Sequence, residues 1–356
     1  MMPMPSEEGA ILPIIKVVGI GGGGGNTVTR MMQAEVRGIE FITVNTDAQA
    51  LERTAADRRI RIGETLTRGL GAGGHPEVGM KAAEENADQI FEILRDSNMV
   101  FITAGMGGGT GTGAAPVVAQ IAKEAGALTV AVVTKPFAVE GHRRRQNAEE
   151  GIAKLKDKVD ALIVIPNDRL LQVVDKKTSV ESSFKIADEV LYQGIQGIAE
   201  IITVPGLMNR DFADVKSILA EAGSALMAIG RAEGDDRATE AAKAAIASPL
   251  LEVSINGAKG VLINFTGGPD MTLFELTEAA DVIAKVADPE ANIIMGAVID
   301  PRMEGEIKIT LIATGFDGKP ALQPKVGSLA KPAQVPSQAA TTQIEEDILT
   351  FLKRRA

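Results

Sequence analysis

Five short runs of apolar, mostly β-branched residues alternate with longer helix-compatible segments between Ile14 and Asn167. The runs are IIKVVGI at 14–20, FITVNT at 41–46, MVFITAG at 99–105, LTVAVVT at 128–134 and ALIVIPN at 161–167. This alternation is typical of a mainly parallel sheet flanked by helices. Each run ends in or next to Gly, Asn, Thr or Pro, so loops should gather at the carboxyl ends of the strands. We therefore predict an α/β fold with its ligand site at that edge.

A long helix and a second pattern follow. Apolar residues recur at spacings of three and four between Ser182 and Thr203, which predicts a helix with one buried face that ends before Pro205-Gly206. After about Ser224 the segment 253–268 resembles paired strands, Met271 to Ala284 a helix, and 292–300 and 306–315 two more strands. We expect a smaller α+β domain there.

The C-terminal segment has too little apolar content to form a core. Between Gly318 and Gln343, four prolines lie among Ala, Gln and Ser, as is typical of a flexible linker. The chain then ends in IEEDILTFLKRRA, whose apolar residues have helical spacing: Ile344, Ile348, Phe351 and Leu352. This tail is either a frayed terminus or a short peptide that folds into a partner's groove.

Composition narrows the possible functions. The balance of 37 basic and 47 acidic residues gives a net charge of −10, which excludes a broad basic surface for nucleic acid. The absence of Cys excludes disulfides, thiolate metal sites and a cysteine nucleophile, and only two histidines are present, His75 and His142. No apolar run approaches the ~20 residues of a membrane span, and no secretory signal is recognisable, so we expect a soluble, cytoplasmic protein.

Two glycine-rich segments follow predicted strands. Gly21 to Asn26 follows the first strand, and Gly107 to Gly113 follows the third and leads into a helix expected over Ala114 to Ala125, with Pro116 in its first turn. Glycines at a strand-to-helix turn let backbone N–H groups approach a phosphate, and the helix N-terminus adds positive potential. A dinucleotide needs one such turn and an acidic residue about 20 positions further on to bind its ribose, for which Asp47 is an imperfect candidate because it lies later in the chain. A nucleoside triphosphate could use both turns. Neither segment ends in G-K-[ST], so a Walker-type site is excluded.

A base could be bound by the long helix. Phe184 and Asp188 are four residues apart and share a face. Phe184 could stack on a purine, and the Asp188 carboxylate could accept from N1–H and the N2 amine of guanine, a donor pair that adenine lacks. The alternatives are a core phenylalanine and a favourable charge near a helix N-terminus. Glu140 and Arg144 could likewise bind the nucleotide or form a solvated charged turn.

A third candidate group follows the long helix. If a helix begins in the segment NRDFADV at 209–215, Asp211 and Asp214 share one face, where they could hold a cation or polarise a water, and Asn209 could cap the helix. The alternative is that these residues only cap the helix and complement its dipole. The glycine-rich segments contain no carboxylate, histidine or lysine that could activate water.

Together these motifs resemble the FtsZ family, the bacterial tubulin-like GTPases of cell division, over about Ile14 to Phe316 and the tail. The most specific match is GGGTGTG at 107–113; NTDAQAL at 45–51, LTRGLGAG at 66–73, IPNDRLL at 165–171 and NRDFADV at 209–215 support it. The resemblance implies a tubulin-like fold. Its parts are an N-terminal extension (1–13), a Rossmann-like GTP-binding domain (14–181), a central helix (182–205), a GTPase-activating α+β domain (206–316), a linker (317–343) and a partner-binding tail (344–356).

The resemblance also implies the roles of individual residues. Phosphate contacts are implied for Gly22, Gly23, Gly24, Gly25, Asn26, Gly109, Thr110 and Gly111. Glu140 and Arg144 are assigned to the nucleotide, and Phe184 and Asp188 to guanine. Asn209, Asp211 and Asp214 are implied to lie at the opposite end of the subunit and to complete the catalytic site of the next subunit in a head-to-tail filament.

The implied ligands are GTP or GDP with Mg²⁺. The implied partners are further copies of this chain, with membrane tethers and division regulators on the tail, at a cytoplasmic midcell ring. Arg210, His75 and His142 depart from the residues usual in the family. Two alternatives are a Rossmann-type oxidoreductase and a tubulin-like filament protein that does not act in division.

Overall fold

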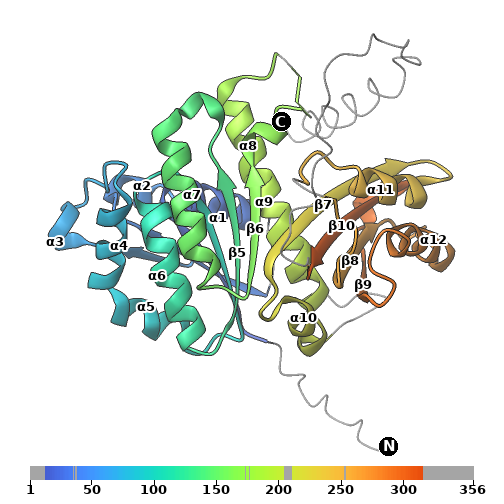
Figure 1. Ribbon diagram of the computed structural model, residues 1–356, viewed down its shortest axis with the longest axis horizontal. Helices are drawn as coiled ribbons and strands as arrows, with labels where there is room; N and C mark the ends of the chain where they lie inside the picture. The colour runs from blue at the N-terminus through green and yellow to red at the C-terminus, as the bar shows by residue number, and fades with distance from the viewer. Residues whose placement is uncertain are drawn as a thin grey trace, which may run out of the picture.

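The strands of the described chain form one continuous sheet. The computed structural model describes residues 13–34, 36, 38–172, 174–175, 177–203, 211–251 and 254–315. In these residues ten strands pair in the order β3-β2-β1-β4-β5-β6-β7-β10-β8-β9 (Figure 1). The predicted α/β fold is confirmed, and each of the five predicted N-terminal strands is present.

The first part of the sheet is parallel. It consists of β1 (Ile15–Ile20), β2 (Ile39–Asn45), β3 (Arg58–Arg61), β4 (Met99–Gly105), β5 (Leu128–Lys135) and β6 (Ala161–Pro166). Successive side chains of a strand point to opposite faces, so both faces of this part are apolar. Val17 and Phe101 lie in the core of one face, and Val18 and Ile102 in the core of the other.

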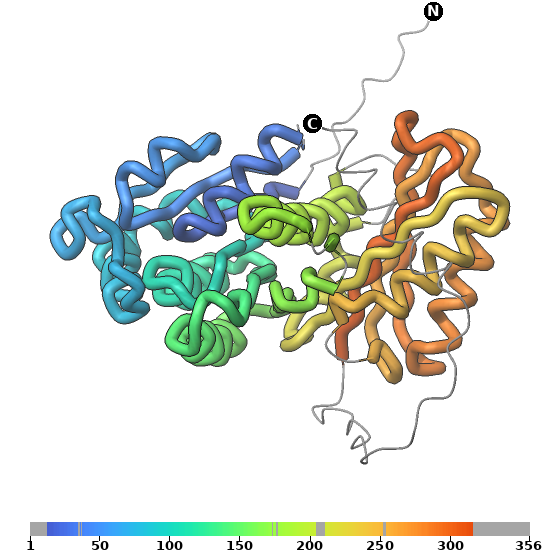
Figure 2. The backbone as a smooth tube through the Cα atoms, turned by 90° about the horizontal axis from the view of Figure 1, so that it is seen from above, coloured from blue at the N-terminus to red at the C-terminus, as the bar shows by residue number. Residues whose placement is uncertain are grey.

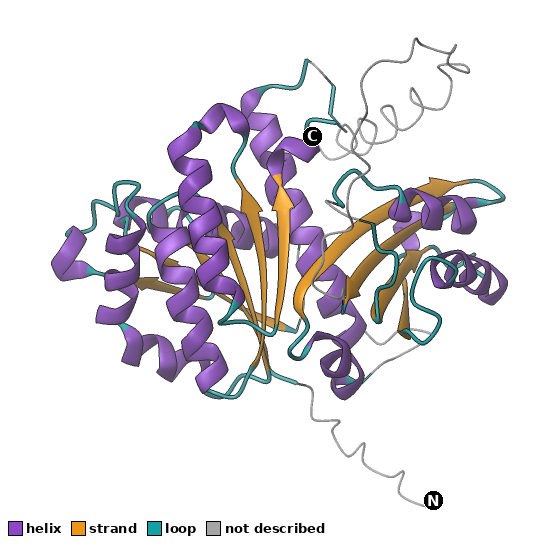
Figure 3. Ribbon diagram, viewed as in Figure 1, coloured by secondary structure: helices purple, strands orange, loops and turns teal. Residues whose placement is uncertain are grey.

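Helices cover both faces of the parallel strands (Figure 3). One face packs against α1 (Gly21–Gln33), α9 (Val180–Thr203) and α10 (Phe212–Leu219). The other packs against α4 (Pro76–Glu85), α5 (Ala87–Leu94), α6 (Thr110–Glu124) and α7 (His142–Lys156). Short elements lie in the connections: α2 (Ala48–Glu52), α3 (Glu64–Thr67), the 3-10 turn η1 (Ala138–Glu140) and α8 (Asn167–Leu170).

The second part of the sheet is mixed. It contains β7 (Gly223–Glu233), β8 (Gly260–Gly267), β9 (Asn292–Ile299) and β10 (Glu306–Thr314), with the 3-10 turn η2 (Pro301–Met303) before β10. Strand β7 pairs with β6 over three residues in parallel and then with β10 antiparallel, so it joins the two parts. Helices α11 (Arg237–Ile246) and α12 (Leu273–Ala284) pack against the mixed strands in a third apolar core.

Helix α9 lies between the two parts of the sheet (Figure 2). The predicted helix from Ser182 to Thr203 is confirmed, and it begins two residues earlier. Two of its glycines permit close packing on the mixed strands. A Cβ atom at Gly194 would lie 2.5 Å from the sulfur of Met227 in β7, and one at Gly197 would lie 2.6 Å from Cγ2 of Thr310 in β10. Side chains at these positions would push the helix off the sheet.

The structure differs from the sequence prediction at several points. Strands β3 and β7 were not predicted, because β3 reads RRIR at an exposed edge and β7 is rich in Ala and Gly. Residues 254–259 form no strand before β8. Helix α6 begins at Thr110, so Pro116 lies inside it and not in its first turn. The predicted linker and tail lie outside the described residues. No helix among the described residues is long and apolar enough to cross a membrane.

Candidate functional site

The two glycine-rich segments meet at the point where the strand order reverses. Strand β1 lies between β2 and β4, and the chain leaves it towards β2 on one side before it reaches β4 on the other. Crevices at such switch points bind ligands in open α/β sheets. The first segment forms the start of α1 after β1, and the second joins β4 to α6.

Close backbone packing between the segments and against β4 requires glycine at several positions. A Cβ atom at Gly24 would lie 2.3 Å from the carbonyl oxygen of Thr103, and one at Gly111 would lie 2.8 Å from that of Gly105. At Gly21, which has φ +71°, a Cβ atom would lie 3.0 Å from the amide nitrogen of Gly111. Gly21, Gly24 and Gly111 are thus required by backbone packing.

Other parts of the glycine-rich segments face open space. A Cβ atom at Gly22 or Gly108 would have no neighbour within 4 Å, and Asn26 is exposed. Helices α1 and α6 both begin at this edge, and neither has an acidic residue in its first turn. Two helix N-termini with free backbone N–H groups form an environment suited to an anion such as a phosphate chain. Asp47, the residue considered for the ribose of a dinucleotide, instead caps α2 by accepting from Ala50 N at 3.0 Å.

Helix α7 connects two loops at this edge. The side-chain amide of Asn147 lies 3.3 Å from the carbonyl oxygen of Gly74 and 3.4 Å from that of Gly107. Arg143 contacts Nδ1 of His75 at 3.3 Å. Sequence reasoning did not single out Asn147, since its partners are 73 and 40 residues away in the chain and no local pattern marks them.

Phe184 and Asp188 lie on α9 beside this edge. Phe184 is 41% exposed, so it is not an ordinary core residue, and its ring meets that of Phe137 edge-on with centroids 5.3 Å apart. Asp188 follows the start of α9 by eight residues, which is too far for the helix-terminus explanation. Burial raises the pKa of Asp188 to about 7, although the positive charge of Arg30 on α1 opposes the shift. Such a half-buried carboxylate favours a ligand that donates hydrogen bonds to it.

Glu140 and Arg144 form an ion pair of 2.6 Å at the end of β5. Glu140 also accepts from the backbone nitrogen of Phe137 at 2.9 Å. Through this bond Glu140 holds the turn that carries Phe137 against Phe184. The turn is therefore charged, but it is also structurally fixed beside the exposed ring.

Asp211 and Asp214 lie at the other end of the sheet. Helix α10 leads into the amino end of β7, which runs parallel to β6, whereas the glycine-rich segments follow the carboxyl ends of β1 and β4. Figure 1 shows α10 at the end opposite the arrowheads of β5 and β6. Asp211, not Asn209, caps α10: its side chain accepts from Asp214 N at 2.8 Å. Asn209 lies outside the described residues.

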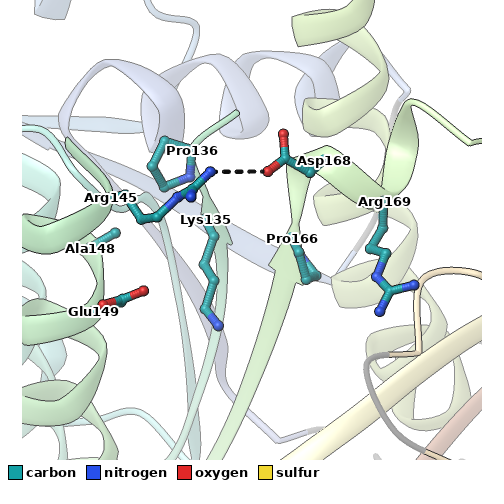
Figure 4. Close-up of a pocket in the computed structure, with 8 residues that line it drawn as sticks. All are labelled: Lys135, Pro136, Arg145, Ala148, Glu149, Pro166, Asp168 and Arg169. Carbon is teal, nitrogen blue, oxygen red and sulfur yellow. Dashed lines mark ion pairs between the residues drawn. The ribbon is translucent and has the colours of Figure 1, made fainter. Parts of the chain in front are cut away.

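A cavity of about 220 Å³ opens beside α7, at the carboxyl ends of β5 and β6 (Figure 4). Arg145 and Asp168 form an ion pair of 3.5 Å at its rim, and Asp168 also accepts from the backbone nitrogen of Ala138 at 2.8 Å. None of the predicted site residues lines it. The cavity is thus distinct from the edge of the sheet where the two glycine-rich segments meet.

Comparisons with known proteins agree with this geometry. The model of the Tubulin/FtsZ family GTPase domain matches residues 14–175, and that of the FtsZ family C-terminal domain matches residues 223–317. An empty FtsZ dimer from M. jannaschii is 46% identical, with a TM-score of 0.84 over 91% of this chain and 95% of that one. A point mutant of FtsZ from M. jannaschii is 49% identical, with a TM-score of 0.83 over 85% and 91%.

A more distant structure shares the fold alone. The GTPγS-bound protofilament of CetZ2 from Haloferax volcanii is 18% identical, with a TM-score of 0.72 over 96% of this chain and 100% of that one.

Proposed function

The chain belongs to the Tubulin/FtsZ family and carries its GTPase domain, and we propose that its subunits assemble head to tail into filaments that form the scaffold of a cell-division ring. The observation that carries this proposal is the separation of two incomplete half-sites. The two glycine-rich segments suit the phosphates of a guanine nucleotide but contain no carboxylate, histidine or lysine that could activate water, and the acidic pair Asp211 and Asp214 lies at the other end of the sheet.

The dimensions of the sheet support a site shared between subunits. Strand β5 has eight residues, and at ~3.3 Å per residue the two ends of the parallel sheet are roughly 26 Å apart. No side chain spans that distance, so in this proposal Asp214 would act on the nucleotide of another copy. A contact between unlike ends of identical subunits propagates as an open filament unless its rotation closes a ring. Asn209, Asp211 and Asp214 would then complete the hydrolytic site of the neighbouring subunit.

Asp211 and Asp214 occupy different positions at the start of α10. One oxygen of Asp211 accepts the capping bond from the backbone of Asp214, so Asp211 also fixes the start of α10. Asp214 is placed in the first turn of that helix, with its side chain half-buried. Both carboxylates would act on the neighbouring subunit's nucleotide, and Asp211 would in addition orient the start of the helix.

Nucleotide contacts complete the proposal. Gly22 to Asn26 and Gly109 to Gly111 would bind phosphates, Glu140 and Arg144 the nucleotide, and Phe184 and Asp188 the guanine base. The described residues contain no group of three or more His, Cys, Asp or Glu side chains that could hold a metal ion. Mg²⁺ would therefore be bound mainly by the phosphates and water, as is common for this ion.

The identity of the more similar proteins favours a role in division over another filament function. The relatives at 46% and 49% identity are FtsZ proteins, and the C-terminal family model is specific to FtsZ, whereas CetZ2 shares only the fold. An oxidoreductase is disfavoured because the GTPase-domain model spans both glycine-rich segments. The tail at 344–356 would bind membrane tethers and regulators of division.

Sedimentation and phosphate release with GTP, GDP, ATP or NAD test the proposal. Pelleting only with GTP, and hydrolysis per subunit that rises above a threshold concentration, are expected. Asp214→Ala should keep GTP binding and lose most hydrolysis, whereas Asp157→Ala, an exposed carboxylate after α7, should hydrolyse normally. Concentration-independent hydrolysis without pelleting would mean a self-contained site.

Mixed subunits test the shared site directly. The Asp214→Ala variant keeps an intact nucleotide pocket but lacks an acidic residue of the other half-site. The Asp188→Ala variant keeps both Asp211 and Asp214 but lacks a residue of the nucleotide pocket. In a random equimolar filament about one interface in four joins an intact pocket to intact acids, so about a quarter of the normal rate should return. No recovery in co-pelleting mixtures would refute catalysis between subunits.

A further inference from the structure

Two threonine hydroxyls connect the end of β2 to the signature glycine-rich segment. Thr46 follows β2 directly, and its Oγ1 lies 2.6 Å from Oγ1 of Thr110, the first residue of α6. The Thr46 residue is fully buried, whereas Thr110 is half-buried. Thr46 is held firmly, because its carbonyl oxygen accepts from Thr67 Oγ1 and from the backbone nitrogen of Gly71, each at 3.2 Å.

The burial of the pair fixes the direction of its hydrogen bond. Thr110 Oγ1 is the one hydrogen-bond partner of Thr46 Oγ1 in the described part of the chain. A buried hydroxyl hydrogen without an acceptor is costly, so Thr46 donates and Thr110 accepts. The hydrogen of Thr110 must then point elsewhere. Because Thr110 is half-buried beside the open face of Gly108, a ligand above the glycine turn can receive it.

We propose that Thr46 is a positioning residue that orients the Thr110 hydroxyl as a hydrogen-bond donor to a phosphate oxygen of the bound nucleotide. The inference rests on the proposed guanine-nucleotide site. A hydroxyl that accepts one bond becomes a stronger donor in the next, and an anionic acceptor strengthens that bond further. Without the Thr46 hydroxyl, the Thr110 hydroxyl is neither polarised nor held in one orientation by a donated bond, so its bond to the nucleotide weakens.

The same strand contains a matched control. Thr43 Oγ1 lies 3.2 Å from Thr54 Oγ1, and both residues are buried. Thr54 donates to the carbonyl oxygen of Leu51 at 2.7 Å, so Thr43 is the donor of this pair. The chain of bonds ends on a backbone oxygen within α2 and not at the signature segment Gly107 to Gly113. Thr43→Val therefore removes the same kind of bond without changing a phosphate donor.

The test compares Thr46→Val, Thr46→Ser and Thr43→Val in affinity for GDP, for a non-hydrolysable GTP analogue and for guanosine. Thr46→Val should weaken binding of both phosphorylated ligands about three- to tenfold and leave guanosine binding unchanged. Thr46→Ser, which restores the hydroxyl, should bind like the wild type. Thr43→Val should bind normally, although its melting temperature falls as much as that of Thr46→Val.

A double-mutant cycle shows whether Thr46 acts through Thr110. Thr110→Val should weaken phosphate binding, and Thr46→Val should add no further loss in that background. Additive losses, or equal affinities of Thr46→Val and Thr43→Val, would overturn the inference. If Thr46→Val does not fold, Thr110→Val is measured alone. A normal affinity of that variant for GDP would overturn the inference. A wild-type protein that binds no guanine nucleotide would instead overturn the proposed function.

Discussion

The raised pKa of Asp188 predicts that the affinity for a guanine nucleotide depends on pH. To accept from N1–H and the N2 amine of guanine, this carboxyl group must be ionised. Burial raises its pKa to about 7, so the ionised fraction falls from about 0.9 at pH 8 to about 0.1 at pH 6. The affinity for GDP should therefore fall about tenfold between these two pH values.

The same shift has a consequence for stability with a definite sign. The folded protein retains a proton on Asp188 up to about pH 7, whereas an unfolded aspartate releases it near its ordinary value of 3.8. The folded state therefore binds more protons than the unfolded state between these pH values, and stability falls as the pH rises through this range. About 3 pH units at 1.36 kcal/mol each give an upper value of about 4 kcal/mol. Guanine bound as proposed would offset this cost by donating to the carboxylate.

The assay is calorimetric titration of GDP from pH 6 to pH 8. Because the terminal phosphate of GDP also titrates in this range, the wild type is compared with Asp188→Asn, which cannot ionise. The ratio of the two dissociation constants isolates the contribution of Asp188. A ratio that is constant within twofold from pH 6 to pH 8 would refute the assignment of Asp188 to the base.

The asparagine variant also changes the preferred base. Its amide group can donate to the C2 carbonyl of xanthine and accept from N1–H, whereas guanine presents it with two donors. Paired hydrogen bonds to a base edge discriminate by about 1–3 kcal/mol, so Asp188→Asn should shift preference from GDP towards xanthosine diphosphate by roughly tenfold or more. An unchanged preference would place the base elsewhere.

Three further predictions concern packing and the tail. Gly24→Ala should destabilise the nucleotide-free protein by more than about 2 kcal/mol, because its methyl group would lie 2.3 Å from the carbonyl oxygen of Thr103. The control Gly22→Ala, whose methyl group faces open space, should unfold in urea like the wild type. Arg237→Met should lower the urea midpoint in the same assay, since it removes the buried guanidinium that pairs with Asp270 and with the half-buried carboxylate of Glu275. Deletion of 344–356 should spare GTP-dependent pelleting and abolish capture by a membrane-tethering division protein; capture that persists would refute the role of the tail.

The fold of the parallel part could be predicted because its signals are local. Each buried strand is a run of β-branched residues that ends at a turn residue, and the glycines mark the turns that matter. The strand β7 shows the limit of this reasoning. Its sequence GSALMAIGRAE has weak strand propensity, and it forms a strand because β6 and β10 pair with its two edges and α9 packs on it through Gly194.

The site could be predicted in its chemical type but not in its geometry. The sequence placed Phe184 and Asp188 on one helix face, yet neither the contact of Phe184 with Phe137 nor the pKa of Asp188 follows from spacing, since both depend on α1 and the turn after β5. The hydroxyl bond between Thr46 and Thr110 joins residues 64 positions apart, and no periodic pattern reveals it. Such long-range pairs require the folded backbone.

The glycine-rich segments show why residue type alone does not separate structure from function. Gly24 is required because the backbones of β4 and α1 approach each other closely, whereas Gly22 has no neighbour that would exclude a side chain. Packing does not require glycine at position 22, where the backbone faces open space beside two helix N-termini. A ligand that approaches the backbone explains the glycine there better. The distinction separates stability from affinity: substitution at Gly24 should impair folding, and substitution at Gly22 should impair phosphate binding in a protein that remains folded.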